Sequence, residues 1–402
     1  MSIVAVICEY NPFHLGHAYQ LEKIRECLGA DTGIVALMSG NFTQRADVAI
    51  ADKFTRAASA VMSGADLVLE IPFPFSSASA QLYATAGVRL AASLGICDTL
   101  AFGSECGDKE RLCRVAENLS SPALEAALAA AVHERCDTGY PRLLDETYRV
   151  LFGDKDATLL CSPNDTLAVE YLRALAGVTP GMKPLVIPRT GAAYHNRELP
   201  QHGFASASSI RRVITADATI PVPYLPPEVA HLLETERCAG RLPADIDRLS
   251  TAILSYFMLN SPPRPNIHDA EDGLYFRLCK YAHEATSVSS LCDLSATKKY
   301  TRARVRRAIL FSFFGVTSSD VKSAPAYTQL LGATKRGLSL LKQSKAKAGI
   351  PILTKPSDKN SLSAVALRQK ALSDRADELY GLCLPTPRRG ADAYRISPFI
   401  VK

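Results

Sequence analysis

The sequence contains no tryptophan, and aromatic residues make up only 7% of it. Because stacked rings carry much of the affinity of single-strand binders, this scarcity argues against a protein dedicated to holding unpaired bases. No stretch approaches the roughly 18 uncharged apolar residues that a membrane span needs. The N-terminal apolar run meets Glu9 early and has no basic segment before it, so a strand is expected there and not a signal peptide. We therefore expect a cytoplasmic protein with no membrane partner.

Paired cysteines are also lacking. The 11 cysteines are scattered from Cys8 to Cys383 without a CxxC pair, and their number is odd. This pattern suits neither a disulfide framework nor a zinc knuckle. We expect reduced thiols and no metal site built from cysteine.

The charge is distributed unevenly along the chain. Residues 1–215 carry 19 Lys and Arg against 23 Asp and Glu, so of the 46 basic and 40 acidic residues, 27 and 17 fall in 216–402. The formal net charge of +6 therefore comes entirely from the second half. A basic half favours a polyanionic partner such as a nucleic acid.

The length of 402 residues favours two domains. In the first hundred residues, short apolar runs alternate with segments of helical period, which predicts a doubly wound α/β sheet with crossover helices. Proline-rich segments at 221–228 and 261–265 then interrupt a mainly helical pattern. We predict an α/β domain over 1–218 and a mainly α-helical, basic domain over 219–402. The expected strands are 3–8, 33–38, 67–70, 99–102 and 183–187, and the expected early helices are 18–27, 52–63 and 80–94.

The segment Asn11-Pro12-Phe13-His14-Leu15-Gly16-His17 follows the first expected strand and opens the first helix. Such a turn faces the carboxyl edge of the sheet, where open α/β folds bind ligands. Two imidazoles three residues apart share one face of the first helical turn, beside amides and a helix dipole that favour phosphate. Gly16 lets a nucleotide approach the backbone. The turn predicts a triphosphate site; the alternatives are a capping or surface histidine and half of a metal site.

A second candidate element is Ala205-Ser206-Ala207-Ser208-Ser209-Ile210-Arg211-Arg212. Hydroxyls at a helix N-terminus and a following arginine can hold the β- and γ-phosphates through charge-assisted hydrogen bonds. A capped surface helix would have the same pattern.

A basic segment covers 298–350, where 12 Lys and Arg stand against one acid, Asp320, for a net charge of +11. Lys299, Arg302 and Arg306 share one helical face, a spacing that suits several phosphates along an RNA backbone. The alternative is an ordinary solvated face.

The first motif resembles the HxGH signature of nucleotidyltransferases, in which the histidines stabilise charge at the α-phosphate. Further segments extend the likeness, over almost the whole chain, to the bacterial tRNA(Met) cytidine acetate ligase family. Two positions depart from the family pattern, Leu15 in place of Asn and Ala46 in place of Gly. The matching segments are Met38–Phe42, Gln44-Arg45, 63–72, Phe102–Glu105, Ser162–Asn164, Arg189 with Ala193-Tyr194-His195, 297–301 and 330–337.

This resemblance implies a Rossmann-like nucleotidyltransferase domain that uses ATP and acetate, followed by a tRNA-binding helical domain. ATP, accompanied by Mg²⁺, would react with acetate to give acetyl-adenylate and pyrophosphate. The acetyl group would pass to N4 of the wobble cytidine, position 34, of elongator tRNA(Met), giving N4-acetylcytidine and AMP. The partners implied are acetate and elongator tRNA(Met); the oligomeric state is left open.

The resemblance also assigns residues. His14, His17 and Arg211 would be catalytic, and Lys298, Lys299, Arg302, Arg306, Lys335 and Arg336 would bind tRNA. The implied ATP-binding residues are Ile7, Cys8, Glu9, Tyr10, Asn11, Pro12, Phe13, His14, Leu15, Gly16, His17, Ala18, Tyr19, Gln20, Gly103, Asn164, Arg189, Thr190 and Ser206.

Three other functions remain open at this point. The same site chemistry would serve a small-molecule adenylyltransferase or an acetate ligase that acts on a carrier protein. A non-catalytic RNA-binding protein that has kept a nucleotide fold is the third, although the motif residues His14, Gly16, His17 and Arg211 argue against it.

Overall fold

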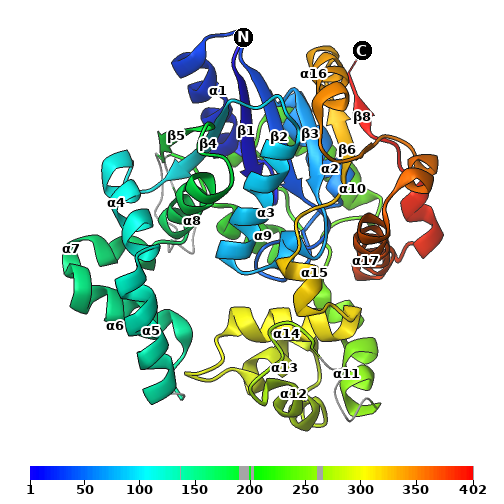
Figure 1. Cartoon of the computed structure of the whole chain (residues 1–402). Coiled ribbons are helices and arrows are strands. Elements are labelled where there is room, and N and C mark those ends of the chain that lie inside the picture. The colour runs from blue at the N-terminus through cyan, green and yellow to red at the C-terminus, as the bar shows by residue number, and fades with distance from the viewer. Residues whose placement is uncertain (136, 190–198, 201–202, 260–265, 402) are drawn as a thin grey trace.

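The structure, a computed structural model, describes residues 1–135, 137–189, 199–200, 203–259 and 266–401. One sheet with strand order β5-β4-β1-β2-β3-β6-β7 lies at its centre, and β8 pairs with β6 (Figure 1). The strands are β1 (Ile3–Cys8), β2 (Gly33–Ser39), β3 (Leu67–Ile71), β4 (Thr99–Ser104), β5 (Lys183–Pro188), β6 (Thr328–Ala333), β7 (Ile352–Leu353) and β8 (Phe399–Ile400).

The first five strands are parallel and confirm the doubly wound α/β prediction. They lie within two residues of their expected bounds. The expected early helices are also present, as α1 (Leu15–Leu28), α2 (Lys53–Met62) and α3 (Ala80–Ser93). The segment between β4 and β5 is mostly helical and forms α4 (Lys109–Leu119), α5 (Pro122–Glu134), α6 (Tyr140–Phe152), α7 (Asp154–Ala157) and α8 (Pro163–Val178).

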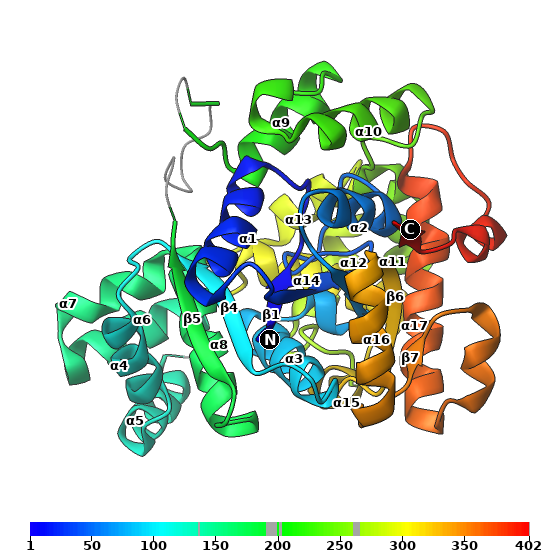
Figure 2. The same cartoon turned by 90° about the horizontal axis from the view of Figure 1, so that it is seen from above.

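Alternate residues of each central strand face two different helical layers, because successive side chains of a strand point to opposite faces. In β1, Ile3, Ala5 and Ile7 pack in the layer of α3, α8 and α16 (Lys335–Lys347). Val4 and Val6 pack in the layer of α1, α2, α9 (Ala207–Asp217) and α10 (Pro227–Cys238). Figure 2 shows these layers on opposite sides of the sheet. Burial on both faces explains why the strands read as continuous apolar runs.

The second half supplies a helical bundle that packs below the carboxyl edge of the sheet (Figure 1). Phe42 and Phe73 leave the loops after β2 and β3 and contact Phe314, at ring-centroid distances of 5.4 and 5.0 Å. The bundle therefore shares its core with the loops that end the strands. Its helices are α11 (Ser250–Leu259), α12 (Leu274–Ala282), α13 (Val288–Ser295) and α14 (Arg302–Phe314), followed by the short α15 (Ser318–Lys322).

Three strands of the second half join the central sheet, which the sequence analysis did not anticipate. β6 pairs antiparallel with β3, and β7 and β8 pair with β6. The pattern of β6, Thr-Gln-Leu-Leu-Gly-Ala before a lysine and an arginine, has no alternation because it is buried on both faces. The division of the chain at 218/219 stays a prediction, but the sheet extends across it. No helix in the described part of the chain is long and apolar enough to cross a membrane.

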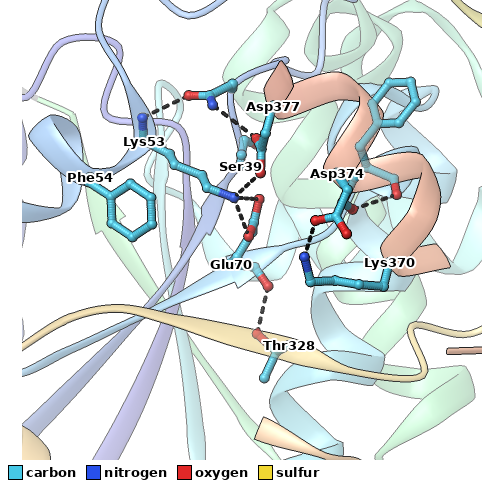
Figure 3. Close-up of polar contacts among 12 residues, drawn as sticks. Ser39, Lys53, Phe54, Glu70, Thr328, Lys370, Asp374 and Asp377 are labelled. Carbon is cyan, nitrogen blue, oxygen red and sulfur yellow. Dashed lines mark hydrogen bonds and ion pairs between the residues drawn. The ribbon is translucent and has the colours of Figure 1, made fainter. Parts of the chain in front are cut away.

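A buried ionic cluster ties the last long helix, α17 (Ala364–Tyr380), to the sheet (Figure 3). The Lys53 ammonium donates to both carboxylate oxygens of Glu70 at 2.9 and 2.8 Å and to Asp377 Oδ2 at 2.6 Å. The Asn41 amide donates to Asp377 Oδ1 at 2.9 Å, while its Oδ1 accepts from the backbone N–H of Lys53 at 2.8 Å. Burial alone would lower the pKa of Lys53, but the two carboxylates raise it, so the ammonium stays charged.

We predict that Lys53→Met lowers the free energy of unfolding by about 3–5 kcal/mol, because it leaves Glu70 and Asp377 buried without a cation. The matched control is Lys370→Ala, which removes an ion pair between two residues of α17, Lys370 and Asp374. It should lower the free energy of unfolding by about 1 kcal/mol or less. Urea denaturation followed by circular dichroism measures both. Equal losses in the two variants would contradict the role given to the cluster.

Candidate functional site

The candidate site lies at the carboxyl edge of the sheet, where the chain leaves β1. β1 has β2 on one side and β4 on the other. From β1 the chain adds β2 and β3 on one side of the sheet and then β4 and β5 on the other. The strand order therefore reverses between β1 and β4, and open α/β sheets bind ligands at the carboxyl ends of the strands at such a switch point. The turn 9–17 that carries the two histidines stands at that point.

His14 and His17 cap the first turn of α1 with their own side chains. His14 Nδ1 accepts from the backbone N–H of Gly16 at 3.0 Å, and His17 Nδ1 accepts from the backbone N–H of His14 at 3.3 Å. The two rings stack with centroids 3.8 Å apart. The arrangement is a capping box in which imidazoles replace the usual hydroxyl and carboxylate.

Both imidazoles are neutral at physiological pH. Burial, with the Arg189 and Arg211 guanidinium groups nearby, lowers the pKa of His14 to about 3. Burial, with His14 and Arg189 nearby, likewise lowers the pKa of His17 well below its ordinary value. Because each Nδ1 accepts a hydrogen bond, each neutral ring carries its proton on Nε2. Within the described residues neither Nε2 has a hydrogen-bond partner, so the turn presents two unused N–H donors.

Gly16 is required by the histidine cap. A Cβ at Gly16 would lie 2.9 Å from His14 Cε1, closer than side-chain carbons approach one another. The aromatic rings of Tyr10 and Phe13 pack around His17, at centroid distances of 4.9 and 5.5 Å. The rings therefore fix the imidazole, while the glycine leaves room for it.

Two arginines approach the turn from other elements. Arg211 Nη1 donates to the carbonyl of Asn11 at 2.6 Å, and Asn11 Oδ1 accepts from the backbone N–H of Ile50 at 2.8 Å. Arg189 follows β5, where its backbone N–H donates to Ser104 O at 2.9 Å. Both guanidinium groups lower the pKa of His14. The structure thus brings together His14, His17 and Arg211, the three residues predicted to be catalytic.

Ser206 and Gly103, both predicted to bind ATP, lie at the start of α9 and near the end of β4. Ser206 is the N-cap of α9, and its Oγ accepts from the backbone N–H of Ser209 at 3.1 Å. A Cβ at Gly103 would lie 3.3 Å from Arg189 Cγ, so the absence of a side chain at Gly103 leaves space for the aliphatic part of Arg189.

The loop after β4 is held by an aspartate that the sequence analysis did not single out. Asp165 Oδ1 accepts from Ser104 Oγ at 2.6 Å and from the backbone N–H of Glu105 at 2.7 Å. The predicted Asn164 next to it donates through Nδ2 to Glu105 Oε1 at 2.6 Å. Asn164 therefore reaches the site's rim through Glu105, and Asp165 fixes the backbone beneath.

Arg56 of α2 is the second residue that was missed. Arg56 is 1% exposed, and within the described residues its guanidinium donates to backbone carbonyls alone. It donates to Glu9 O at 2.6 Å and Ala51 O at 2.9 Å, and also to the carbonyls of Ser39 and Gly40. One buried cation thus holds the chain as it leaves β1 and as it leaves β2. No local pattern distinguishes this arginine from one on a solvated helix.

Glu9 and Ala46 connect the histidine turn to the loop after β2. The Glu9 carboxylate accepts from the backbone N–H of Gln44 at 2.7 Å. Ala46 has a φ of 55°, in the left-handed region that favours glycine. The departure from the family's glycine therefore places a Cβ where it strains the backbone, whereas Leu15, the other departure, is an ordinary first residue of α1.

The remaining predicted ATP residues have mixed surroundings. Ile7 belongs to the core, and burial raises the pKa of the Cys8 thiol, whose Sγ donates to Leu37 O at 3.6 Å. A thiol kept protonated is a poor nucleophile. Tyr19 packs on Phe204 at 5.4 Å. Pro12 lies buried in the turn, Ala18 and Gln20 lie on α1, and Thr190 falls outside the described residues.

The basic residues predicted to bind tRNA do not form one patch. Lys298 and Lys299 precede α14, while Arg302 pairs with Asp293, and Arg306 Nη1 pairs with Asp47 at 3.1 Å. Many charges of the basic segment therefore have acidic partners from outside it. The net of +11 counted along the sequence overstates the field at the surface.

Lys335 and Arg336 lie at the opposite edge of the sheet. Arg336 Nη1 donates to the carbonyl of Thr32, the residue before β2, at 3.4 Å. The backbone N–H of Thr334 donates to Asp66 O, just before β3, at 2.8 Å. These contacts place the start of α16 at the amino edge, about the length of a strand, roughly 20 Å, from the histidine turn.

Known proteins match this chain along nearly its full length. A family model for HIGH nucleotidyl transferases matches residues 1–393. The chain is 32% identical to the tRNA(Met) cytidine acetate ligase of Thermoanaerobacter sp. (strain X514) and 33% identical to that of Acetivibrio thermocellus, over 95% and 96% of both chains. The chain belongs to the tRNA(Met) cytidine acetate ligase family.

Solved structures agree with that membership. The crystal structure of Thermotoga maritima TmcAL bound with alpha-thio ATP has a TM-score of 0.89 and is 30% identical, with 100% of each chain covered. The apo form of the same protein has a TM-score of 0.90. The Rossmann-like nucleotidyltransferase fold implied by the motif is thereby confirmed. Among the described residues, no group of three or more His, Cys, Asp and Glu could hold a metal ion.

We predict that His14→Asn and His17→Asn each lower acetate-dependent pyrophosphate exchange about a hundredfold, as loss of one transition-state donor does elsewhere. Asparagine keeps an acceptor for the helix cap but lacks the Nε2 donor. The matched control, His231→Asn on the exposed face of α10, should exchange normally. Undiminished exchange in a folded His14→Asn, His17→Asn double variant would contradict the site.

We further predict that the two histidines make the protein less stable in acid. Their pKa values are lower in the folded chain than in the unfolded one, so their contribution is complete above pH 6.5 and is lost as the pH falls. Between pH 7 and pH 5 each should cost up to about 2 kcal/mol. Urea denaturation at both pH values should show a smaller loss in the double asparagine variant than in the wild type. Equal losses would mean that the imidazoles titrate normally.

Proposed function

We propose that the protein condenses ATP with acetate and then transfers the acetyl group to a tRNA cytidine. The products would be N4-acetylcytidine at position 34 of elongator tRNA(Met), AMP and pyrophosphate. The observation that carries this proposal is the pair of neutral imidazoles, each with an unused Nε2 donor, beside Arg189 and Arg211. Family membership supports the choice of acetate and tRNA(Met).

In the first step, an acetate oxygen attacks the α-phosphorus of ATP. The bond from that phosphorus to the bridging oxygen breaks, and pyrophosphate leaves with the electron pair. The Nε2 donors of His14 and His17 suit the charge that builds on the α-phosphate oxygens, because neutral donors fixed before binding need no reorganisation. Arg211 and the Ser206 cap of α9 suit the pyrophosphate, where charge-assisted hydrogen bonds are strongest.

In the second step, the cytidine N4 amine attacks the carbonyl carbon of acetyl-adenylate. The carbon–oxygen bond to AMP breaks, and the amine gives up one proton. An exocyclic amine reacts poorly with a free carboxylate but well with a mixed anhydride, so adenylation makes the transfer feasible. No protein nucleophile is needed, which fits the protonated Cys8 thiol.

Mg²⁺ would arrive with the ATP phosphates. Magnesium is commonly held by substrate phosphates, waters and one or two carboxylates. The described residues offer no cluster that could act as a dedicated cage, and Asp165, the carboxylate beneath the site, already accepts three hydrogen bonds. When bound, the ion would neutralise phosphate charge.

For tRNA we propose contacts from Lys298, Lys299, Arg302 and Arg306, because these residues lie on the bundle that packs at the carboxyl edge, where the histidines stand. Lys335 and Arg336 could reach the same RNA only if it extended over the length of the strands to the other edge.

We predict that ¹⁴C-acetate, ATP and total tRNA yield labelled N4-acetylcytidine after digestion to nucleosides. Free acetate suffices because the site activates it by adenylation. An acetyl thioester is already activated, so its use would not require ATP. Omission of ATP should abolish the label. Label found only in protein would favour an acetate ligase acting on a carrier protein, and exchange without any labelled nucleoside would favour a small-molecule adenylyltransferase.

Two charge-matched double variants test the tRNA contacts. We predict that Lys298→Ala, Lys299→Ala weakens tRNA binding and lowers the slope of log affinity against log salt by about 1 to 2, because two phosphate contacts are lost. Lys335→Ala, Arg336→Ala removes the same charge from the amino edge and should change the slope little. Filter binding over a salt series measures both. Equal changes in the salt slope for the two double variants would mean that the RNA contacts both the carboxyl and the amino edge of the sheet.

A further inference from the structure

A cavity of about 210 Å³ lies away from the histidine turn. Its walls come from the start of α2, from β6, from the segment 353–359, from α17 and from the C-terminal segment 393–398. None of the residues predicted to bind ATP or tRNA lines it. The cavity is therefore a separate feature, and neither step of the proposed reaction uses it.

Lys53 and Asp377 of the buried ionic cluster (Figure 3) line this cavity. Lys53 is fully engaged by Glu70 and Asp377. Beside it on α17, Lys370 pairs with Asp374. Each of these charged groups therefore has an ionic partner, and the three carboxylates exceed the two ammonium groups by one charge.

The walls carry polar groups that are not satisfied in this way. In the described part of the chain, the ammonium groups of Lys355 and Lys359 have no ion pair, and the Gln329 amide and the Ser397 hydroxyl have no hydrogen bond. The lining contains four lysines and two aspartates. Lys53 and Lys370 are already paired with Glu70, Asp377 and Asp374, so Lys355 and Lys359 are the lining cations left to meet an anion.

The rest of the lining is apolar and includes an exposed aromatic ring. Tyr394 is 42% exposed, and its hydroxyl donates to Glu378 Oε1 at 2.6 Å, which fixes the ring. Phe54, Leu353 and Ile396 complete an apolar wall. A small pocket with two free cations, one amide and a fixed aromatic ring suits a planar group that carries a phosphate.

We propose that this cavity binds one nucleotide unit. Its phosphate would meet Lys355 and Lys359, its base would stack on Tyr394, and the Gln329 amide would donate to and accept from the base edge. The unit has two possible sources, a free nucleotide that acts as an effector or one nucleotide of the tRNA strand. The second source rests on the proposed function; the first does not.

The test uses Lys355→Ala, Lys359→Ala in the full chain, with Lys109→Ala, Lys183→Ala as the control of equal charge on exposed residues away from the cavity. Calorimetric titration with cytidine 5′-monophosphate, at saturating ATP analogue to fill the histidine site, reports the free nucleotide. Filter binding of tRNA reports the strand. Acetate-dependent pyrophosphate exchange without tRNA reports the histidine site and should be unchanged in both variants.

A loss of about tenfold or more in one of the two affinities, confined to the cavity variant, supports the proposal and identifies the source. Tyr394→Leu should weaken the same ligand, whereas Tyr394→Phe, which keeps the ring, should not. Affinities for both probes that match those of the control variant would overturn the proposal. Normal pyrophosphate exchange together with no tRNA binding by the wild type would instead count against the proposed function. The titration with cytidine 5′-monophosphate would then still test the cavity.

Discussion

The hydrogen bonds from two backbone amides of α1 to the Nδ1 atoms of His14 and His17 are the constraint on which the site depends. They begin the helix, and they also leave the proton of each neutral ring on Nε2. Burial, with the guanidinium groups of Arg189 and Arg211 nearby, lowers the pKa of His14 and keeps its ring neutral. A charged ring would have no acceptor nitrogen and could not cap the helix. The start of the helix, the tautomer and the proposed chemistry therefore depend on the same two hydrogen bonds.

The loops around this turn are held from behind by the second half of the chain. The Lys53 cluster joins α17 to the start of α2 and to β3, and Arg306 pairs with Asp47 in the loop after β2. Arg56, one turn along α2 from Lys53, then holds the carbonyls at the ends of β1 and β2. The position of the histidine turn therefore depends on residues roughly 290 or more positions further along the chain.

Most of the first half was predictable, because local signals and tertiary contacts agree there: apolar runs, helical period and the HxGH turn all point to one α/β arrangement. β6 was missed because its sequence, Thr-Gln-Leu-Leu-Gly-Ala, has only two large apolar residues and thus no apolar run of strand length, and because its antiparallel partner β3 lies about 260 positions earlier. Arg56 and Asp165 were missed for a related reason. Their function comes from backbone groups that only the fold brings near them, and a charged side chain in a helix usually indicates solvent.

The central claim is that both motif histidines are neutral with the proton on Nε2 before any ligand binds. ¹⁵N-labelled histidine, observed by long-range ¹⁵N–¹H correlation between pH 5 and pH 8, reports tautomer and titration for each ring, with His14→Asn and His17→Asn variants to assign the signals. We expect two rings with a protonated Nε2, an unprotonated Nδ1 and no titration over this range. A proton on Nδ1 in either ring, or titration near the ordinary pKa of histidine, would contradict the account.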